Sequence, residues 1–475
     1  MKAVVPRPVR AALWILALLA PAITILPAAP AATKKAAEEA ARKAAAGEGP
    51  ILAGAAAHDI TPPVGGTAAT VTLAGFGEGR VATGVRDPIF ARALVLECSG
   101  AAFGLVTLDL FAIDREDVEA IRHEARSRLE GKELSGLLVV ATGTRFGPDL
   151  QGVFSGPGVR VDPAWRNRLV SETAAAIAEA WRDRTPARLS FATTRLPRLL
   201  EDDRRPLRLD DQAWLLRLEN ARSRVGIAAV AEFSAAPETL PRGGREISAE
   251  WPGGAAATLE GAFGGVGMIL PGAQAGRMQP AREPAGPEAF GAAVARALVV
   301  AWSGRVEGAA PMPADLTTGR IVLRTRSLSV PIETAEWREA VARGVRRGSE
   351  SGTERGTEVA ALRITGAGLP VLDLACIPGV PFPELVNGGI EAPQESAADL
   401  PGAPIEAPLR SFMPAPVKMI AAACGDDLGD LLPASEWDAR PPFSYGLASA
   451  PRGEERSAGP RTASVLWRAF AELFQ

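Results

Sequence analysis

The sequence predicts a large α/β domain in which mixed β-sheets are flanked by helices. Short β-rich apolar runs alternate with segments of helical period along most of the 475 residues. The hydrophobic fraction is 47%, enough for a substantial core and too high for a disordered chain. The folded part begins near Pro50, and the length is enough for one large domain or two ordinary ones.

The N-terminus has the composition of a targeting segment. Three basic residues lie within the first ten positions, an apolar run follows at Ala11–Leu26, and small residues occupy Pro27–Ala32. Residues 1–32 are expected to be a signal peptide or, if uncleaved, a membrane anchor. Residues 33–49, rich in Ala, Lys and Glu, read as a tether. An extracytoplasmic location follows, whether periplasmic, envelope or secreted, with possible membrane association through this segment.

Strands are predicted where apolar residues run without a break, and helices where they recur every three or four positions. Val118 to Leu129, Pro163–Arg182 and Phe290 to Trp302 have the helical spacing, and a last helix covers Thr462–Phe474. The expected strands are Ala91–Cys98, Ala102–Leu110, Gly136–Thr142, Val225–Phe233, Val266–Leu270, Ile321–Val330, Val359–Ile364, Val371–Ile377 and Val417–Ala423. Pro- and Gly-rich segments at 199–209, 236–245, 388–414 and 438–456 are expected loops, some long enough to cover a cleft.

Composition excludes several classes of function. Lys and Arg number 52 against 55 Asp and Glu, without a long basic block, so no nucleic-acid partner is expected. His58 and His123 are the only histidines; both are expected to be structural, which argues against a Ser-His-Asp triad and the common histidine metal sites. Acidic doublets at 202–203, 210–211 and 426–427 are expected to be solvated in loops.

The three cysteines, Cys98, Cys376 and Cys424, are widely separated in sequence. At most one disulfide can form, and the spacing does not match a zinc knuckle. Cys98 and Cys376 end apolar strands and are expected to be buried and slow to react.

A series of local motifs occurs in a fixed order over nearly all of residues 50–475. It comprises AGAAAHDITPPVGG, VRDPIFARALVLE, GLVTLDLFAID, VVATGTRFGPD, FSAAPETL, ISAEWPGG, GAQAGRMQP, CIPGVPFPEL, GDDLGDLLPASEWD and SAGPRTASVLWRAF. The ordered set resembles the N-terminal catalytic domain of the neutral/alkaline non-lysosomal ceramidases, a family of zinc amidases. The resemblance implies that family's α/β fold, here without its C-terminal immunoglobulin-like domain.

The resemblance also implies that the zinc ligands are changed. The family's Thr-His-Thr-His-Ser-Gly-Pro segment aligns with residues 142–148, so that Gly143 and Arg145 stand where it has histidines. Its His-Pro pair aligns with Ala236-Pro237, and its Pro-Gly-Glu turn places Val380 at the glutamate. Asp430 replaces the tyrosine of a Gly-Tyr turn and alone could still coordinate.

Further positions change beside this site. Arg277 follows Gly276 where the family has Gly-Asp, and the family's serine nucleophile corresponds approximately to Ala273. Glu250 keeps acidic character where the family has aspartate. The resemblance thus implies a catalytically degenerate member that holds no zinc, although zinc is the family's cofactor.

Several hypotheses remain open. The cleft of a pseudoenzyme would bind a small anionic or lipid-like ligand, with Arg145 and Arg277 binding an anion alongside Asp149 and Glu250. Otherwise each arginine pairs with a neighbouring acid such as Asp149, Glu250 or Asp109. An enzymatic alternative is a hydrolase of amides or esters in lipids or cell-surface material, its metal held by Asp109, Asp149, Glu250 and Asp430. A third is a purely structural envelope protein. Two arginines that face the same cleft would repel each other unless acids lie between them. Asp149, Glu250 or Asp430 should therefore lie within salt-bridge reach of Arg145 or Arg277.

Overall fold

The computed structural model describes residues 47–66, 69–155, 161–275, 278–304, 312–346, 348–349, 351–391, 398–400 and 402–475. The expected signal or anchor and nearly all of the expected tether lie outside these residues, as does Arg277. Within the described ranges, no helix is long and apolar enough to span a membrane.

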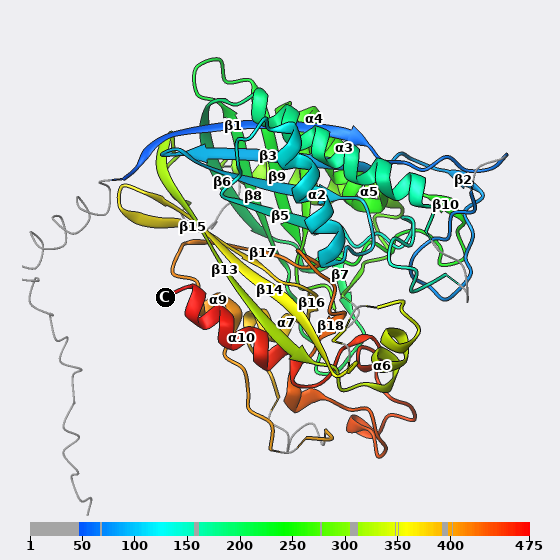
Figure 1. The fold of residues 1–475 in the computed structure, drawn as a ribbon. Helices are drawn as coiled ribbons and strands as arrows, with labels where there is room; N and C mark the ends of the chain where they lie inside the picture. The colour runs from blue at the N-terminus through cyan, green and yellow to red at the C-terminus, as the bar shows by residue number, and fades with distance from the viewer. Residues whose placement is uncertain are drawn as a thin grey trace, which may run out of the picture.

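A branched sheet of twelve strands forms the centre of the molecule, and β1 (Gly49–Asp59) is its branch point. The start of β1 pairs with β6 (Thr185–Arg195) and with β13 (Thr318–Pro331), while Ile51–Asp59 pairs antiparallel with β3 (Phe90–Cys98). Three arms therefore diverge from one strand (Figure 1).

Each arm ends in a pair of parallel strands. The first arm continues from β3 to β4 (Ala101–Leu108) and β5 (Gly136–Ala141). The second arm runs from β6 through β8 (Gln212–Asn220) and β9 (Gly226–Phe233) to β11 (Val266–Pro271). The third runs from β13 through β14 (Glu354–Gly366) and β15 (Leu369–Cys376) to β17 (Val417–Ala421). The parallel pairs are β4 with β5, β9 with β11, and β15 with β17.

Alternation along the strands places apolar side chains on both faces of each arm. In β3, Leu94 and Leu96 join a core shared by all three arms, whereas Ala93 and Val95 join a second core beneath helices. Because both faces are covered, the middle of the strand, Ala93–Leu96, is apolar without a break.

Helices cover the outer face of every arm (Figure 1). In the first arm α2 (Arg115–Arg128) and α3 (Pro163–Arg182) do so, and in the second α4 (Glu250–Phe263) and α5 (Pro287–Trp302). Helix α10 (Thr462–Leu473), drawn in red, packs on the third arm. The short elements are β2 (Gly84–Val85), η1 (Pro197–Leu199), β7 (Leu200–Asp202), β10 (Glu246–Ile247), β12 (Met278–Pro280), α6 (Ala335–Ala342), β16 (Val380–Pro381), α7 (Pro383–Asn387), α9 (Leu409–Phe412), β18 (Asp430–Leu431), η2 (Ala434–Glu436), η3 (Ser444–Gly446) and η4 (Glu454–Arg456).

The predicted α/β class is confirmed, with mixed sheets flanked by helices. Every strand and helix predicted by range is present within a few residues of its expected bounds. Strands β6 and β8 and helix α4 were not predicted. Both strands interrupt their apolar runs with arginine, and the α4 sequence is dominated by Ala and Gly, so neither pattern is strong.

Candidate functional site

A cavity of about 200 Å³ opens where the three arms meet. Its wall is built from segments that follow the carboxyl ends of the parallel pairs, because such ends converge at one edge. The lining residues are Phe111, Ala112, Gly143, Arg145, Val153, Phe154, Ala236, Pro237, Gln274, Glu336, Trp337, Ala340, Arg346, Val380, Ala423, Asp427, Gly429, Asp430, Glu455 and Arg456. We call this the central cavity.

The segment after β17 joins the arms beneath the central cavity. The N–H of Ala422 donates to Pro271 of the second arm at 2.9 Å, and that of Gly425 donates to Val139 of the first arm at 2.8 Å. Between them, the N–H of Ala423 donates to Gly379, just after β15, at 2.9 Å. These backbone bonds fix the relative positions of the loops that line the cavity.

The structure brings together five of the positions singled out from the sequence. Gly143, Arg145, Ala236, Val380 and Asp430 all line the central cavity although they are far apart in the chain. Ala273 is fully buried next to lining residue Gln274, and its N–H donates to Ser234 Oγ at 2.9 Å. It does not line the cavity.

Gly143 occupies a backbone position that disfavours a ligating side chain. Its φ is +87°, in the left-handed region that glycine favours. A Cβ at this position would lie 2.7 Å from Nε2 of Gln274. A histidine here would meet both backbone strain and a steric clash.

Arg145 pairs with an acid that the sequence reasoning did not identify. Its Nε lies 2.5 Å from Oε1 of Glu238, and both side chains are largely buried. Its guanidinium also lies 5.3 Å from the ring centroid of Phe111. Burial lowers the pKa of Arg145, an effect that Glu238 opposes and Arg456 strengthens. Arg145 thus pairs with a neighbouring acid, as one of the two interpretations expected, but the acid is Glu238 and not Asp149, Glu250 or Asp109.

The other arginines of the cavity have acidic partners as well. Arg456 pairs with Asp430, and Arg346 lies 3.1 Å from Asp427. Burial raises the pKa of Asp430, although Arg456 and Arg145 oppose this. Each of the three arginines among the described lining residues is thus matched by a carboxylate, so these residues give the wall no excess of positive charge.

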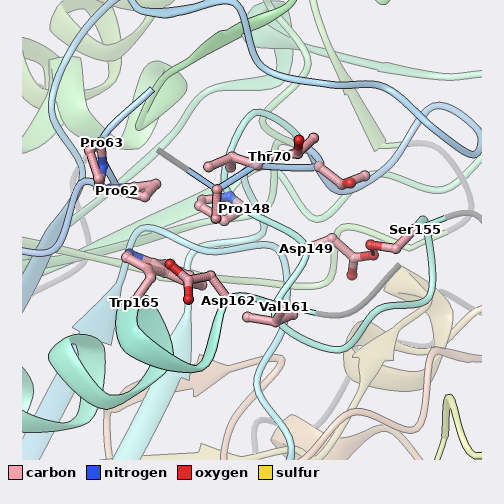
Figure 2. Close-up of a pocket in the computed structure, with 12 residues that line it drawn as sticks. Pro62, Pro63, Thr70, Pro148, Asp149, Ser155, Val161, Asp162 and Trp165 are labelled. Atoms are coloured by element: carbon pink, nitrogen blue, oxygen red, sulfur yellow. Dashed lines mark hydrogen bonds between the residues drawn. The ribbon is translucent and has the colours of Figure 1, made fainter. Parts of the chain in front are cut away.

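Asp149 lies at a different hollow. It accepts hydrogen bonds from the N–H groups of Gly152 and Phe154, at 3.0 and 2.7 Å, and from Ser155 Oγ at 3.0 Å. Figure 2 shows it near Pro148 and Ser155, on the wall of a pocket of about 30 Å³ that also includes Trp165. Asp149 thus stabilises its own loop, in a space that holds about one water molecule.

Glu250 and Asp109 are also occupied away from the central cavity. Glu250 begins α4, and its carboxylate accepts from the N–H groups of Leu240 at 2.6 Å and Trp251 at 2.8 Å. Asp109 pairs with Arg92 at 2.6 Å. The four carboxylates of the rebuilt metal site therefore do not converge, and no cluster of three or more His, Cys, Asp or Glu suited to a metal occurs among the described residues.

Most carboxylates of the acidic doublets are buried, and the two histidines lie on helix α2 and against helix α3. Asp210, Asp426 and Asp427 are buried and ion-paired rather than solvated, which corrects the expectation for these loops. His58 lies between Glu172 and Glu179 of α3, at 2.9 and 3.1 Å, and His123 is exposed on α2. Both histidines have the surroundings expected of structural residues.

Cys98 and Cys376 are buried, as predicted, and so is Cys424; all three are free thiols. The thiol of Cys98 donates to the carbonyl of Gly319 at 2.6 Å. The neighbouring Cys424 thiol, together with burial, raises the pKa of Cys376.

A zinc ion does not fit the central cavity. Gly143, Ala236 and Val380 offer no side-chain donor, and Asp430 is already paired with Arg456. A catalytic zinc site needs about three protein ligands, and nearby guanidinium groups repel a cation.

Gln274 is a polar residue of the cavity that sequence reasoning missed. It is 8% exposed, and its Oε1 is buried without a hydrogen-bond partner among the residues described. An unsatisfied buried carbonyl oxygen is costly, so it marks a place where a donor would be stabilised. Apolar side chains face the same space, including Phe111, Val153 and Phe154. The only sequence signal was its place beside Ala273.

No protein-family model and no curated protein sequence matches this chain. Solved structures do match it. The neutral ceramidase from Pseudomonas aeruginosa superposes with a TM-score of 0.65 at 16% identity, covering 90% of this chain and 74% of the other. A structure described as ceramidase complexed with C2 gives a TM-score of 0.61 at 15% identity, covering 90% and 75%. The fold is therefore neutral ceramidase-like.

Proposed function

We propose that this chain is an exported, catalytically silent protein of ceramidase-like fold whose central cavity binds a small lipid-like ligand. The observation that carries the proposal is the combination of a retained cavity with a donor set unsuited to zinc. Gly143 and Val380 are without ligating atoms, and Asp430 is held by Arg456. This combination supports binding without metal-dependent hydrolysis.

The polar and apolar parts of the wall support an amphiphilic ligand. Phe111, Val153 and Phe154 provide apolar contact. The side-chain amide of Gln274 lies on the same wall, and its unpartnered Oε1, which is covered, would accept from an N–H or O–H group once the side chain turns toward the ligand. The anionic ligand is the less favoured candidate, because Glu238 already neutralises Arg145. A lipid with a neutral, hydrogen-bond-donating head fits this wall better.

A binding experiment tests the ligand class. A fluorescent short-chain N-acyl amino alcohol, titrated into the protein, should bind in the micromolar range with little dependence on salt. Gln274→Leu should weaken binding about tenfold, since one hydrogen bond to a buried acceptor contributes about 1.4 kcal/mol. Gln279→Leu, which lies on β12 outside the cavity wall, should bind like the parent. Salt-sensitive binding that Arg145→Met abolishes would favour the anionic ligand instead.

A metal measurement tests catalytic silence. After incubation with zinc and desalting, the protein should retain far less than one zinc per chain by mass spectrometry. It should release no fatty acid from the same N-acyl probe. Stoichiometric zinc together with probe hydrolysis, both lost in Asp430→Asn, would overturn this part of the proposal and favour the hydrolase.

A further inference from the structure

Cys376 and Cys424 lie side by side although 47 residues separate them in the sequence. Cys376 is the last residue of β15 and pairs with Ala421 of the parallel strand β17. Three residues later, the N–H of Cys424 donates to the carbonyl of Ile377 at 2.9 Å. Their side chains belong to the same buried core, and the neighbouring Cys424 thiol is the largest cause of the raised pKa of Cys376.

This contact lies at the junction of the three arms. Ala423, next to Cys424, lines the central cavity and is bonded to Gly379, while Gly425 is bonded to Val139 of the first arm. Cys424 itself forms an isolated bridge with Val140 of β5. A covalent link between Cys376 and Cys424 would therefore tie the end of β15 to the segment that joins the arms.

We propose that Cys376 and Cys424 are a disulfide-forming pair that locks this junction when the protein folds under oxidising conditions. Both thiols lose a proton, one sulfur–sulfur bond forms, and two electrons pass to a disulfide-bonded oxidant of the glutathione class. The oxidant is released as two thiols after a mixed-disulfide intermediate. No other co-reactant is required.

The timing of the reaction follows from burial. Both side chains are almost inaccessible, at 2% and 3% exposure, so an oxidant cannot reach them in the finished fold. Burial and the neighbouring thiol raise the pKa of Cys376, which disfavours the reactive thiolate. The bond therefore forms while the chain folds. Export, proposed above, would place that step in an oxidising compartment.

Cys98 provides a matched control. It is equally buried, but its thiol donates to Gly319 near the start of β13 rather than to a second cysteine. A non-selective oxidation of buried thiols would include Cys98, whereas the proposed pairing leaves it free.

The test is oxidative refolding of the full chain. Reduced, denatured protein is refolded with a mixture of oxidised and reduced glutathione, or with reductant alone, and peptides are mapped without reduction. We expect one linkage, between the peptides of Cys376 and Cys424, and a thermal midpoint about 5 °C higher than in the reduced protein, because closing a long loop restricts the unfolded chain. Cys376→Ala and Cys424→Ala should lose the oxidised–reduced difference, and Cys98→Ala should keep it.

Three free thiols after oxidative refolding, a linkage through Cys98, or a bond without any rise in the midpoint would overturn the proposal. If refolding fails, protein from a cell-envelope fraction can be alkylated under denaturing conditions. One free thiol before reduction and three after it is the expected count, and three at both stages would overturn the proposal. Neither result depends on whether the cavity binds a ligand.

Discussion

Arg145 and Glu238 form an ion pair in which neither partner can be removed without cost. The side chain of Glu238 is 6% exposed and that of Arg145 is 16% exposed, so each charge depends on the other for compensation. Arg242 approaches Glu238 only at 3.4 Å and from an exposed position. The pair holds the loop after β9 against the loop after β5, on the wall of the central cavity.

Replacing Glu238 with Gln should lower the free energy of unfolding by about 3 kcal/mol, because it removes the ion-pair partner of the buried Arg145 charge. Urea denaturation measures this difference. The double variant Arg145→Met, Glu238→Gln should recover most of the loss, and Glu339→Gln, at an exposed site on α6, should change little. A single variant as stable as the parent would show that the pair is not energetically coupled.

Gly143 has a positive φ, so a side chain at this position should lower the stability of the protein. Gly143→Ala should destabilise the protein by about 1–3 kcal/mol, since a side chain is strained at φ +87° and contacts Gln274. Gly261→Ala is the control, because that glycine lies in α4 with open space around it. It should raise stability by about 0.5–1 kcal/mol. Equal effects in thermal denaturation would contradict the steric argument.

Residue types and motif order were sufficient to predict five positions that line the cavity, although Ala273 does not line it, and they did not predict the partners of these residues. Gly143, Ala236 and Asp430 were selected from local motifs. The loops that carry these motifs all lie at the cavity. Glu238 was overlooked although it lies two residues after Ala236, because a charged residue in a loop usually faces solvent. Pairing across distant loops depends on packing that a single sequence does not encode locally.

At the scale of elements, the predicted strands are those covered on both faces. β4, β5 and the Ala93–Leu96 part of β3 have apolar runs without a charged residue because one face meets the shared core and the other meets helices. β8 was not predicted because Arg217 interrupts its run of apolar residues. In the structure the Arg217 side chain is buried and pairs with Glu219 of the same strand. Its guanidinium lies 4.5 Å from the ring centroid of Trp302 in α5.

Strand β9 carries a buried acid whose ionisation should make stability depend on pH. Burial raises the pKa of Glu232 to about 8, with Asp210 adding to the rise and Arg410 opposing it. The unfolded chain releases this proton near the ordinary value of 4.5, so between the two pKa values the folded state binds one more proton. Stability contributed by the protonated form is therefore lost as pH rises, by at most about 1.4 kcal/mol per pH unit.

Glu232→Gln should remove that dependence, since the amide resembles the protonated acid and remains neutral. We expect parent and variant to have similar free energies of unfolding at pH 5, and the variant to be the more stable at pH 8. Guanidinium denaturation at the two pH values provides the comparison, and Glu339→Gln should keep the parent's dependence. Parallel pH curves for parent and Glu232→Gln would show that Glu232 is ionised in the folded state.

At the scale of the whole molecule, the three arms depend on one strand. Sheet class and helix cover could be predicted from periodicity, but the branching could not, because β1 meets β13 across a sequence separation of more than 250 residues. The start of β1 contributes backbone pairing to β13 through Gly49 and Pro50, and Ile51 is fully buried. Just before it, Glu48 accepts hydrogen bonds from the N–H groups of Ala367 and Gly368, at 3.0 and 2.8 Å.

This arrangement determines how far the N-terminus can be shortened. If residues 33–46 are only a tether, chains beginning at Thr33 and at Gly47 should have the same thermal midpoint. A chain beginning at Leu52 should lose at least about 3 kcal/mol of stability, because it lacks Ile51 and the pairing of β1 with β13. A chain beginning at Gly49 separates the smaller contribution of Glu48. A lower midpoint for the chain from Gly47 would contradict the tether, whereas an unchanged midpoint for the chain from Leu52 would show that the arms are held together without the start of β1.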